Sequence, residues 1–294
     1  MASPIAANRG GILRNRGIRA TRLLRHSLTH LLLGAGAILV LFPLYWMIST
    51  SVKSMTHYYD WPPQWIPNPV TLDSYFSLMS YYPWMLFLRN TLLITAVSTI
   101  GTVISCAVVA YGFTYFRAPG RDFLFLLLLS TMMLPGVVTL VPHFILFRIL
   151  KWINTYYPLT VPSFFGSAFY IFLLRQFFRT LPPELNDAAT IDGCSEFSTL
   201  WRIVLPLCGP ALAAIAIFQF QGHWNEFMGP LIYLNSFKKY TLALGLYSLR
   251  GEPQGSLPTE LMAGGTLMTL PIILAFSLFQ RYFIQGVALT GIKG

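Results

Sequence analysis

The most informative polar residues of this 294-residue sequence lie in a short segment, residues 181–206, that follows a long apolar stretch. Two adjacent prolines at 182 and 183 favour the first turn of a helix. Acids at Glu184 and Asp187 complement the positive N-terminal end of such a helix, and Gly193 can adopt the left-handed turn that ends it. The pattern predicts a short, exposed helix whose chemistry is contact with another protein.

Small side chains at Ala188 and Ala189 leave part of this helix without bulk, so the backbone of another protein could approach closely. A second helix can begin at Ser195 or Cys194. We expect it to pack against the rest of the molecule through three apolar side chains, which are Phe197, Leu200 and Trp201.

Residue patterns for catalysis are missing from the sequence. It has no GxxxxGK[ST] segment to hold ATP phosphates, no Ser/His/Asp arrangement, and no Cys or His spacing typical of a metal site. Cys106, Cys194 and Cys208 are therefore expected to be free thiols. The predictions are that the chain is not an enzyme, holds no metal and binds no cofactor of its own.

Composition places these residues in a membrane protein. The sequence is 55% hydrophobic and only 10% charged, whereas soluble domains carry roughly a quarter charged residues. The net charge is +10, but six arginines precede residue 30 with no acid among them, which fits the positive-inside rule better than nucleic-acid binding. The N-terminus also resembles a signal peptide, yet Leu31–Val52 is long enough to span a bilayer and no cleavage site closes it.

Six uncharged windows are long enough to cross a bilayer. An even number places both termini on one side, and the segments on that side hold 13 of the 20 Lys and Arg, so this side is predicted to be the cytoplasm. The windows are Leu31–Val52, Asn90–Phe116, Phe123–Phe147, Trp152–Leu174, Ile203–Gly222 and Leu261–Gln280.

The remaining segments suit the outer side. Trp61–Pro69 is rich in proline and tryptophan and is predicted to be an external connector, followed at Leu72–Phe87 by a helix along the interface. Asn225–Glu260 is a second external segment. Prolines within spans free a carbonyl that a neighbouring helix or a cavity must satisfy, so pore lining and a simple structural kink remain equally open. The candidate pore residues are Pro135, Pro142, His143 and Asn225.

His143 is an ionisable side chain inside a span, where it could contact a substrate, although a neutral imidazole bonded to a neighbouring helix is the plainer interpretation. The six windows hold no other ionisable group that could bind coupling ions, which argues against an ion-coupled secondary transporter. A membrane-embedded enzyme would need a nucleophile or metal cluster at membrane depth, and the sequence shows none.

The 184–206 loop resembles the EAA loop of importer permeases of the ATP-binding cassette class. That pattern is Glu-Ala-Ala, a Gly a few residues later and, after a further nine residues, Ile-x-Leu-Pro. This sequence has Asp187-Ala188-Ala189, Asp192-Gly193 and Ile203-x-Leu205-Pro206, with Asp187 where the family has Glu. Two other stretches, Trp224–Phe227 and the ending Gln280–Gly294, look like the carbohydrate branch, similar to the six-span partner in maltose-type importers, and Asn90-Thr91-Leu92 fits as well.

The resemblance implies an all-α, six-span permease domain at residues 31–294, preceded by a basic cytoplasmic arm at 1–30. It implies that the 179–206 loop couples to a separate ATPase, which binds ATP with Mg²⁺, while this chain forms half of the translocation pathway. The implied partners are a second homologous permease, two ATPase subunits, an external solute-binding protein and the bilayer of the bacterial inner membrane. The expected substrate is a di- or oligosaccharide; an acidic glycan or glycerol phosphate remains open.

Overall fold

The computed structural model describes residues 7–251 and 257–291, with the side chains of residues 25–250, 257–278 and 280. Within these residues the regular elements are helical, and one isolated bridge joins Lys53 to Val70. The α-helices are α1 (Ala7–Ser51), α2 (Asp73–Tyr81), α3 (Trp84–Tyr115), α4 (Arg121–Ser130), α5 (Gly136–Ile149), α6 (Tyr157–Thr160), α7 (Ala168–Phe178), α8 (Glu184–Ile191), α9 (Glu196–Thr199), α10 (Leu205–Leu207), α11 (Gly209–Trp224), α12 (Met228–Tyr233), α13 (Leu242–Ser248) and α14 (Pro258–Gly291).

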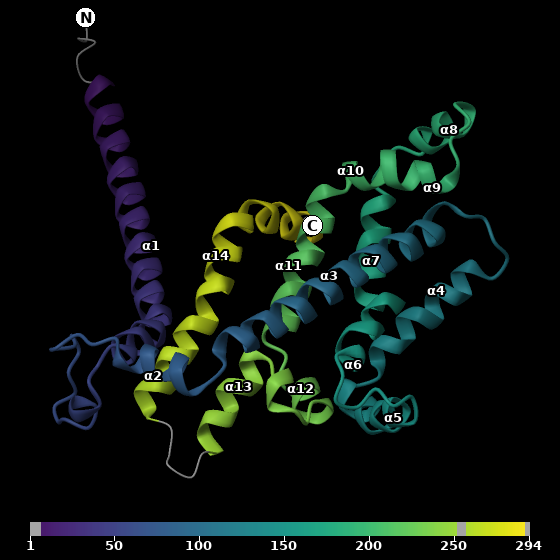
Figure 1. The fold of residues 1–294 in the computed structure, drawn as a ribbon. Coiled ribbons are helices and arrows are strands. Elements are labelled where there is room, and N and C mark those ends of the chain that lie inside the picture. The colour runs from purple at the N-terminus through teal and green to yellow at the C-terminus, as the bar shows by residue number, and fades with distance from the viewer. Residues whose placement is uncertain (1–6, 252–256, 292–294) are drawn as a thin grey trace, which may run out of the picture.

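Short turns of other helix types join them. The 3₁₀ turns are η1 (Met55–His57), η2 (Thr131–Met133), η3 (Val161–Phe165), η5 (Phe237–Lys239) and η6 (Leu249–Gly251), and the segment η4 (Leu200–Val204) is a π-helix. In Figure 1, α8 and α9 lie at one end of the molecule with the N-terminal end of α1, whereas α5, α12 and α13 lie at the opposite end.

The long helix α3 is the centre of the bundle and packs against α7, α11 and η3 (Figure 1). Small side chains let these backbones come close, because Ala107 and Ala110 of α3 and Ala211 and Ala214 of α11 are buried. Close packing of this kind holds helices together in lipid, where burial of apolar surface supplies little driving force. The helix α3 therefore runs between the two ends of the molecule as the central, closely packed helix of the bundle.

The bundle agrees with the predicted all-α membrane fold, although the spans differ in detail. Four helical segments are long and apolar enough to cross a bilayer, and the number reaches six if each of two bent helix pairs counts as one span. The four are Arg25–Ser51, Trp84–Tyr115, Tyr157–Phe178 and Pro258–Leu278.

The third predicted span, 123–147, is broken into two helices, in line with the kink that its prolines had left open. The segment Arg121–Met133 meets α5 at 98°. Pro135 causes this break, because a residue before proline is driven out of the helical region and Leu134 is extended, with φ −81° and ψ 116°. The helix α5 therefore runs across the direction of α4, and only Phe147 among its residues is buried.

The fifth predicted span, 203–222, is also bent. A bend of 83° at Cys208 separates Glu196–Leu207 from α11, which then continues to Trp224. Pro210 follows the bend and has no N–H to extend the preceding helix. The fourth predicted span, 152–174, begins later, and it is interrupted at Gly166, whose φ of +82° is left-handed.

The predicted interfacial helix at 72–87 is two elements. The helix α2 ends at Tyr81, and Pro83 then precedes Trp84, the first residue of α3. The second span thus begins before Asn90, where the sequence placed its start, and Asn90 lies buried inside α3. The external connector folds back on α1, since Tyr45 and Ser49 donate hydrogen bonds to the Trp65 carbonyl at 2.7 and 2.8 Å.

Much of the helix α1 stands away from the bundle in Figure 1, and its apolar stretch of 18 residues has no buried residue in this chain. It packs along α14, where the Met47 sulfur would lie 3.1 Å from a Cβ added at Gly265. The side chains of the basic arm before Arg25 lie outside the described residues, as do those after Gln280 in the C-terminal stretch.

Candidate functional site

The helix predicted at the start of the loop is α8, which begins at Glu184 directly after Pro183. Glu184 and Asp187 occupy its first turn and are exposed, as predicted. Ala188 points to the surface, whereas Ala189 is buried and packs α8 onto the molecule. One alanine thus faces outward beside Asp187, and the other faces inward.

Gly193 ends this helical turn with φ of +76°, in the left-handed region that the sequence predicted. A Cβ built at this residue would meet no atom within 4 Å, so the backbone angle is the reason for a glycine here. Asp192, just before it, caps the helix and is exposed. Ser195 then begins α9, and its hydroxyl accepts from the Ser198 N–H at 3.3 Å.

The contact that ties the loop to the bundle was not anticipated. Tyr111, buried near the end of α3, donates its hydroxyl to Glu196 Oε2 at 2.6 Å and lies 3.0 Å from Asn186 Oδ1. One tyrosine of a spanning helix therefore holds α8 and α9 together. In the sequence, this tyrosine is one aromatic residue near the end of an apolar window, where aromatic residues are common, so no signal singled it out.

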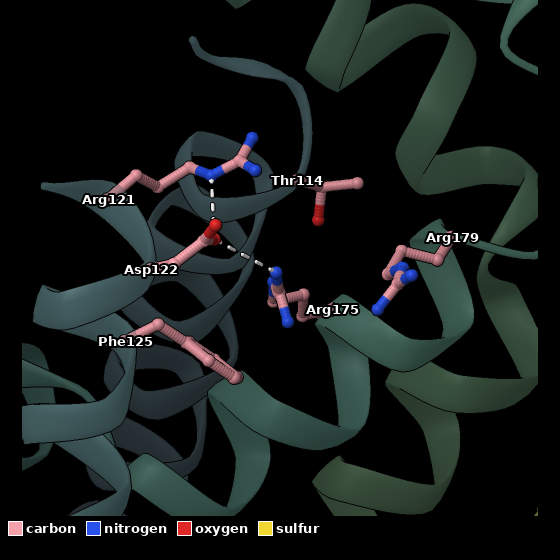
Figure 2. Close-up of a pocket in the computed structure, with 6 residues that line it drawn as sticks. All are labelled: Thr114, Arg121, Asp122, Phe125, Arg175 and Arg179. Atoms are coloured by element: carbon pink, nitrogen blue, oxygen red, sulfur yellow. Dashed lines mark hydrogen bonds and ion pairs between the residues drawn. The ribbon is translucent and has the colours of Figure 1, made fainter. Parts of the chain in front are cut away.

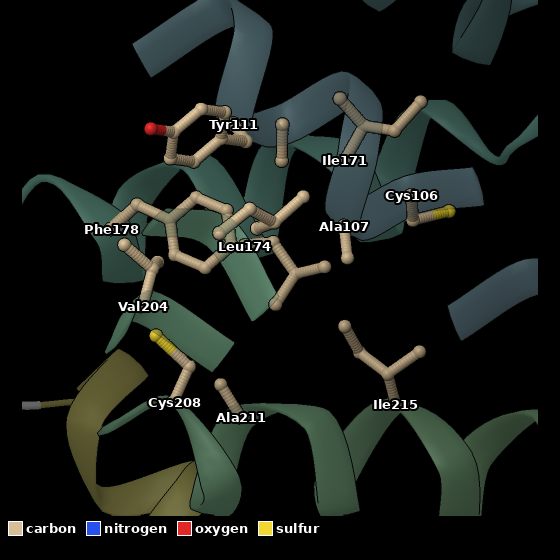
Figure 3. Close-up of a cluster of buried hydrophobic side chains, with 12 residues drawn as sticks. Cys106, Ala107, Tyr111, Ile171, Leu174, Phe178, Val204, Cys208, Ala211 and Ile215 are labelled. Carbon is tan, nitrogen blue, oxygen red and sulfur yellow. The ribbon is translucent and has the colours of Figure 1, made fainter. Parts of the chain in front are cut away.

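Tyr111 also belongs to a buried cluster of apolar side chains that connects the loop to the membrane-spanning helices (Figure 3). The cluster joins α3, α7, η4 and α11 through side chains that include Phe178, Leu174, Val204 and Ile215. Leu200 belongs to it, as predicted, and Leu205 packs against its edge. Movement of the loop would therefore displace closely packed helices rather than a flexible tether.

Two predicted anchors of the second helix were wrong. Phe197 is 69% exposed and Trp201 is 40% exposed, and their rings contact each other with centroids 5.8 Å apart. They face away because Leu200 and Val204 occupy the inward face of this turn. Ile191, the last residue of α8, is also exposed, at 85%.

The last part of the loop motif lies at the bend before α11. Ile203 and Leu205 are half-buried and Pro206 is exposed within α10. The motif residues thus continue from α8, through η4, to the start of a membrane-spanning segment. The structure brings Glu184, Asp187, Ala188, Ala189, Asp192 and Gly193 together on one short arm, with Ile203, Leu205 and Pro206 at its base.

The candidate pore residues lie at the opposite end of the molecule. Pro135 precedes α5, and Pro142 and His143 lie within it, all exposed in this chain. The His143 ring stacks on Phe147, with centroids 5.8 Å apart. Asn225 caps α11, and its amide donates to the Gln221 carbonyl at 3.0 Å. The helix α5 and the segment after Asn225 both contact one buried apolar cluster. The first does so through Phe147 and the second through Phe227.

A second anchor, also missed, fixes the segment after α12. Asn90 in α3 donates to the carbonyls of Lys238 and Tyr240 at 2.9 and 3.0 Å, and Thr91 accepts from the Leu242 N–H at 2.8 Å. The sequence singled out these residues only as the start of a span. Groups of His, Cys, Asp or Glu able to hold a metal are absent from the part of the chain that the structure describes.

Comparisons with known proteins agree with this arrangement. Residues 100–289 match the family described as binding-protein-dependent transport system inner membrane component. The chain is 37% identical over 232 residues to the arabinooligosaccharides transport system permease protein AraQ of Halalkalibacterium halodurans, covering 78% of this chain and 81% of that protein. It is 32% identical over 267 residues to the sn-glycerol-3-phosphate transport system permease protein UgpE of Yersinia enterocolitica, covering 88% and 94%.

The fold also matches a solved structure. A chain of a bacterial ABC transporter involved in the import of the acidic polysaccharide alginate superposes with a TM-score of 0.78, at 22% identity, over 96% of this chain and 100% of that one. At this identity the likeness concerns the fold alone.

Proposed function

The chain belongs to the binding-protein-dependent transport system inner membrane components, in their carbohydrate branch, and we propose that it couples sugar import to a separate ATPase through α8. The supporting observation is the Tyr111 hydroxyl, which donates a hydrogen bond to Glu196 and lies beside the Asn186 side chain. This contact joins α8 and α9 to α3, so a displacement of α8 would also displace the central helix. The outward residues of α8 provide charge at Asp187 and close approach at Ala188.

The proposed assembly has this chain and a second homologous permease as the two halves of the pathway. Two ATPase subunits bind ATP with Mg²⁺ on the cytoplasmic side, and an external solute-binding protein delivers the substrate. The proposed orientation places the end with α8 in the cytoplasm together with both termini, because the loops at that end carry the excess of Lys and Arg. Pro135, Pro142, His143 and Asn225 are proposed to face the pathway near its outer end.

The proposed substrate is an oligosaccharide. The relative AraQ is named for arabinooligosaccharides and the structural neighbour for alginate, so both extended neutral and acidic glycans belong in the test. Uptake assays with the cognate binding protein and a panel of labelled glycans decide between them. Uptake of sn-glycerol-3-phosphate in place of every glycan would contradict the assignment.

The coupling role is tested by adding bulk to the exposed face of α8. We expect Ala188→Trp to block docking, so the ATPase no longer co-purifies and uptake is lost. Ala118→Trp is the matched control, because Ala118 is exposed at the same end but lies in the turn between α3 and α4, outside the 179–206 loop. The chain purified alone is expected neither to bind nor to hydrolyse ATP. Normal co-purification by Ala188→Trp, or nucleotide binding by the isolated chain, contradicts the proposal.

A further inference from the structure

A cationic pocket lies where the N-terminal end of α4 meets the C-terminal end of α7 (Figure 2). Its volume is about 430 Å³, within the range of small-ligand sites. Three arginines and a single carboxylate supply its charge. The lining residues are Thr114, Arg121, Asp122, Phe125, Arg175 and Arg179.

Two of the arginines are held in place by the protein. Arg121 donates from Nε to Asp122 Oδ1 at 3.2 Å and from Nη1 to the Phe116 carbonyl at 3.1 Å. Arg175 donates from Nε to the Phe113 carbonyl at 3.2 Å, and its guanidinium lies 4.0 Å above the Phe125 ring. Fixed guanidinium groups cost little ordering entropy when a ligand binds.

The third arginine supplies charge that the protein does not neutralise. The Arg179 side chain has no hydrogen bond or ion pair with any residue that the structure describes. Asp122 is the only acid in the lining, and it is already bonded to Arg121 and lies 3.8 Å from Arg175. Arg117 lines an adjoining hollow of about 450 Å³, so the region as a whole has a clear excess of positive charge.

This geometry favours a phosphate group. Guanidinium forks match phosphate oxygens, and the N-terminal end of α4 adds a further partial positive charge. Beyond the arginines, α4 exposes Phe123, Leu124, Leu126 and Leu127, each more than half exposed in this chain. A ligand with a phosphate head and apolar chains would satisfy both surfaces at once, whereas free phosphate would use only the first.

We propose that this pocket binds the phosphate of an anionic phospholipid of the inner leaflet, with its acyl chains along α4. The leaflet assignment rests on the orientation under the proposed function, since anionic lipids are enriched at the cytoplasmic surface. The bound lipid lies beside the turn between α3 and α4, at the same end of α3 as Tyr111.

The test measures lipids that stay bound to the complete transporter. The transporter is reconstituted in nanodiscs of equal parts phosphatidylcholine and phosphatidylglycerol, extracted in mild detergent, and analysed by native mass spectrometry. We expect selective retention of phosphatidylglycerol, reduced about fivefold by Arg179→Gln, as loss of one arginine near an anionic surface predicts. Arg121→Gln should act in the same direction. Arg25→Gln is the matched control, because Arg25 is exposed on α1, a helix that Figure 1 shows apart from α4 and α7.

Equal retention by wild type and Arg179→Gln, or equal losses for Arg179→Gln and Arg25→Gln, would overturn the proposal. Displacement of the lipid by millimolar inorganic phosphate would also overturn it and assign the pocket to a free anion. Loss of ATPase co-purification with unchanged lipid retention would assign the arginines to a protein contact instead. Lipid retention does not depend on the orientation of the protein in the membrane, and reporter fusions measure that orientation directly. A failure of the lipid proposal is therefore distinguishable from a failure of the proposed orientation.

Discussion

The hydroxyl of Tyr111 lies 2.6 Å from the carboxylate of Glu196, although 85 residues separate them in the sequence. The first belongs to the central spanning helix and the second to the short helix after α8. A hydrogen bond to a charged group is worth about 1.5–3 kcal/mol, enough to hold the arm in one position against the bundle.

Removing the Tyr111 hydroxyl should weaken the attachment of α8 and α9 to α3. We expect Tyr111→Phe to keep the packed ring but to lower the amount of sugar imported per ATP hydrolysed, measured in proteoliposomes. Tyr115→Phe is the matched control, since the tilted Tyr115 ring lies 4.8 Å from the Tyr111 ring and its hydroxyl donates, within the described residues, to the Phe178 carbonyl at 3.3 Å. Equal ratios in Tyr111→Phe and wild type would remove the coupling role from this contact.

A β-branched residue at position 193 should misdirect the loop. Gly193→Val meets no steric obstacle from neighbours but carries the left-handed penalty of about 1–2 kcal/mol, so uptake should fail while membrane insertion persists. Gly193→Asn should retain much more uptake, because asparagine tolerates this conformation. Asp187→Lys should weaken uptake less completely than Gly193→Val. The measurement is uptake together with ATPase co-purification in the same cells. Wild-type values for Gly193→Val would contradict the coupling assignment.

Two glycines of α3 should respond oppositely to alanine. A Cβ at Gly101 would lie 2.8 Å from the Phe164 ring, so Gly101→Ala should destabilise the transporter by about 1–3 kcal/mol. A Cβ at Gly112 would meet only Phe116, at 3.9 Å, so Gly112→Ala should be neutral or slightly stabilising through helix propensity. Thermal unfolding in detergent distinguishes them. A lower Tm for Gly112→Ala than for Gly101→Ala would refute this packing argument.

The outer segment should loosen when its amide anchor is removed. Asn90→Leu leaves the carbonyls of Lys238 and Tyr240 without their donor, at a cost of about 1–3 kcal/mol. We expect a lower Tm and faster proteolysis after α12. Asn225→Leu is the control, because its amide bonds only within its own helix, to Gln221, and is exposed. Unchanged proteolysis of Asn90→Leu would show that other contacts hold this segment.

The proposed orientation predicts the behaviour of reporter fusions. A reporter active only in the cytoplasm should function after Gly294 or within residues 117–122, and it should be inactive near Trp65 or Lys239. The reason is the concentration of Lys and Arg in the first set of segments. Activity at both outer sites would overturn the six-span orientation.

Local sequence signals were sufficient for α8, because its prolines, acids and Gly193 act within a few residues. They were insufficient for Tyr111, whose role depends on a contact between distant segments. Hydropathy correctly located the apolar segments, and a kink at Pro135 was one of two interpretations, but neither signal carries information on direction, so the angle of 98° was not predicted. The same limit affected Phe197 and Trp201. They were assigned inward because they are apolar, whereas Leu200 and Val204 occupy the inward face.

The packing of α1 against α14 has a consequence for biosynthesis. The helix α1 is synthesised long before α14, so a nascent chain must keep α1 in the bilayer without that neighbour until α14 has been made. Its strongly apolar window makes this residence in lipid stable. A nonsense mutation anywhere before Pro258 would therefore leave an inserted helix without its neighbour, a ready target for membrane quality control.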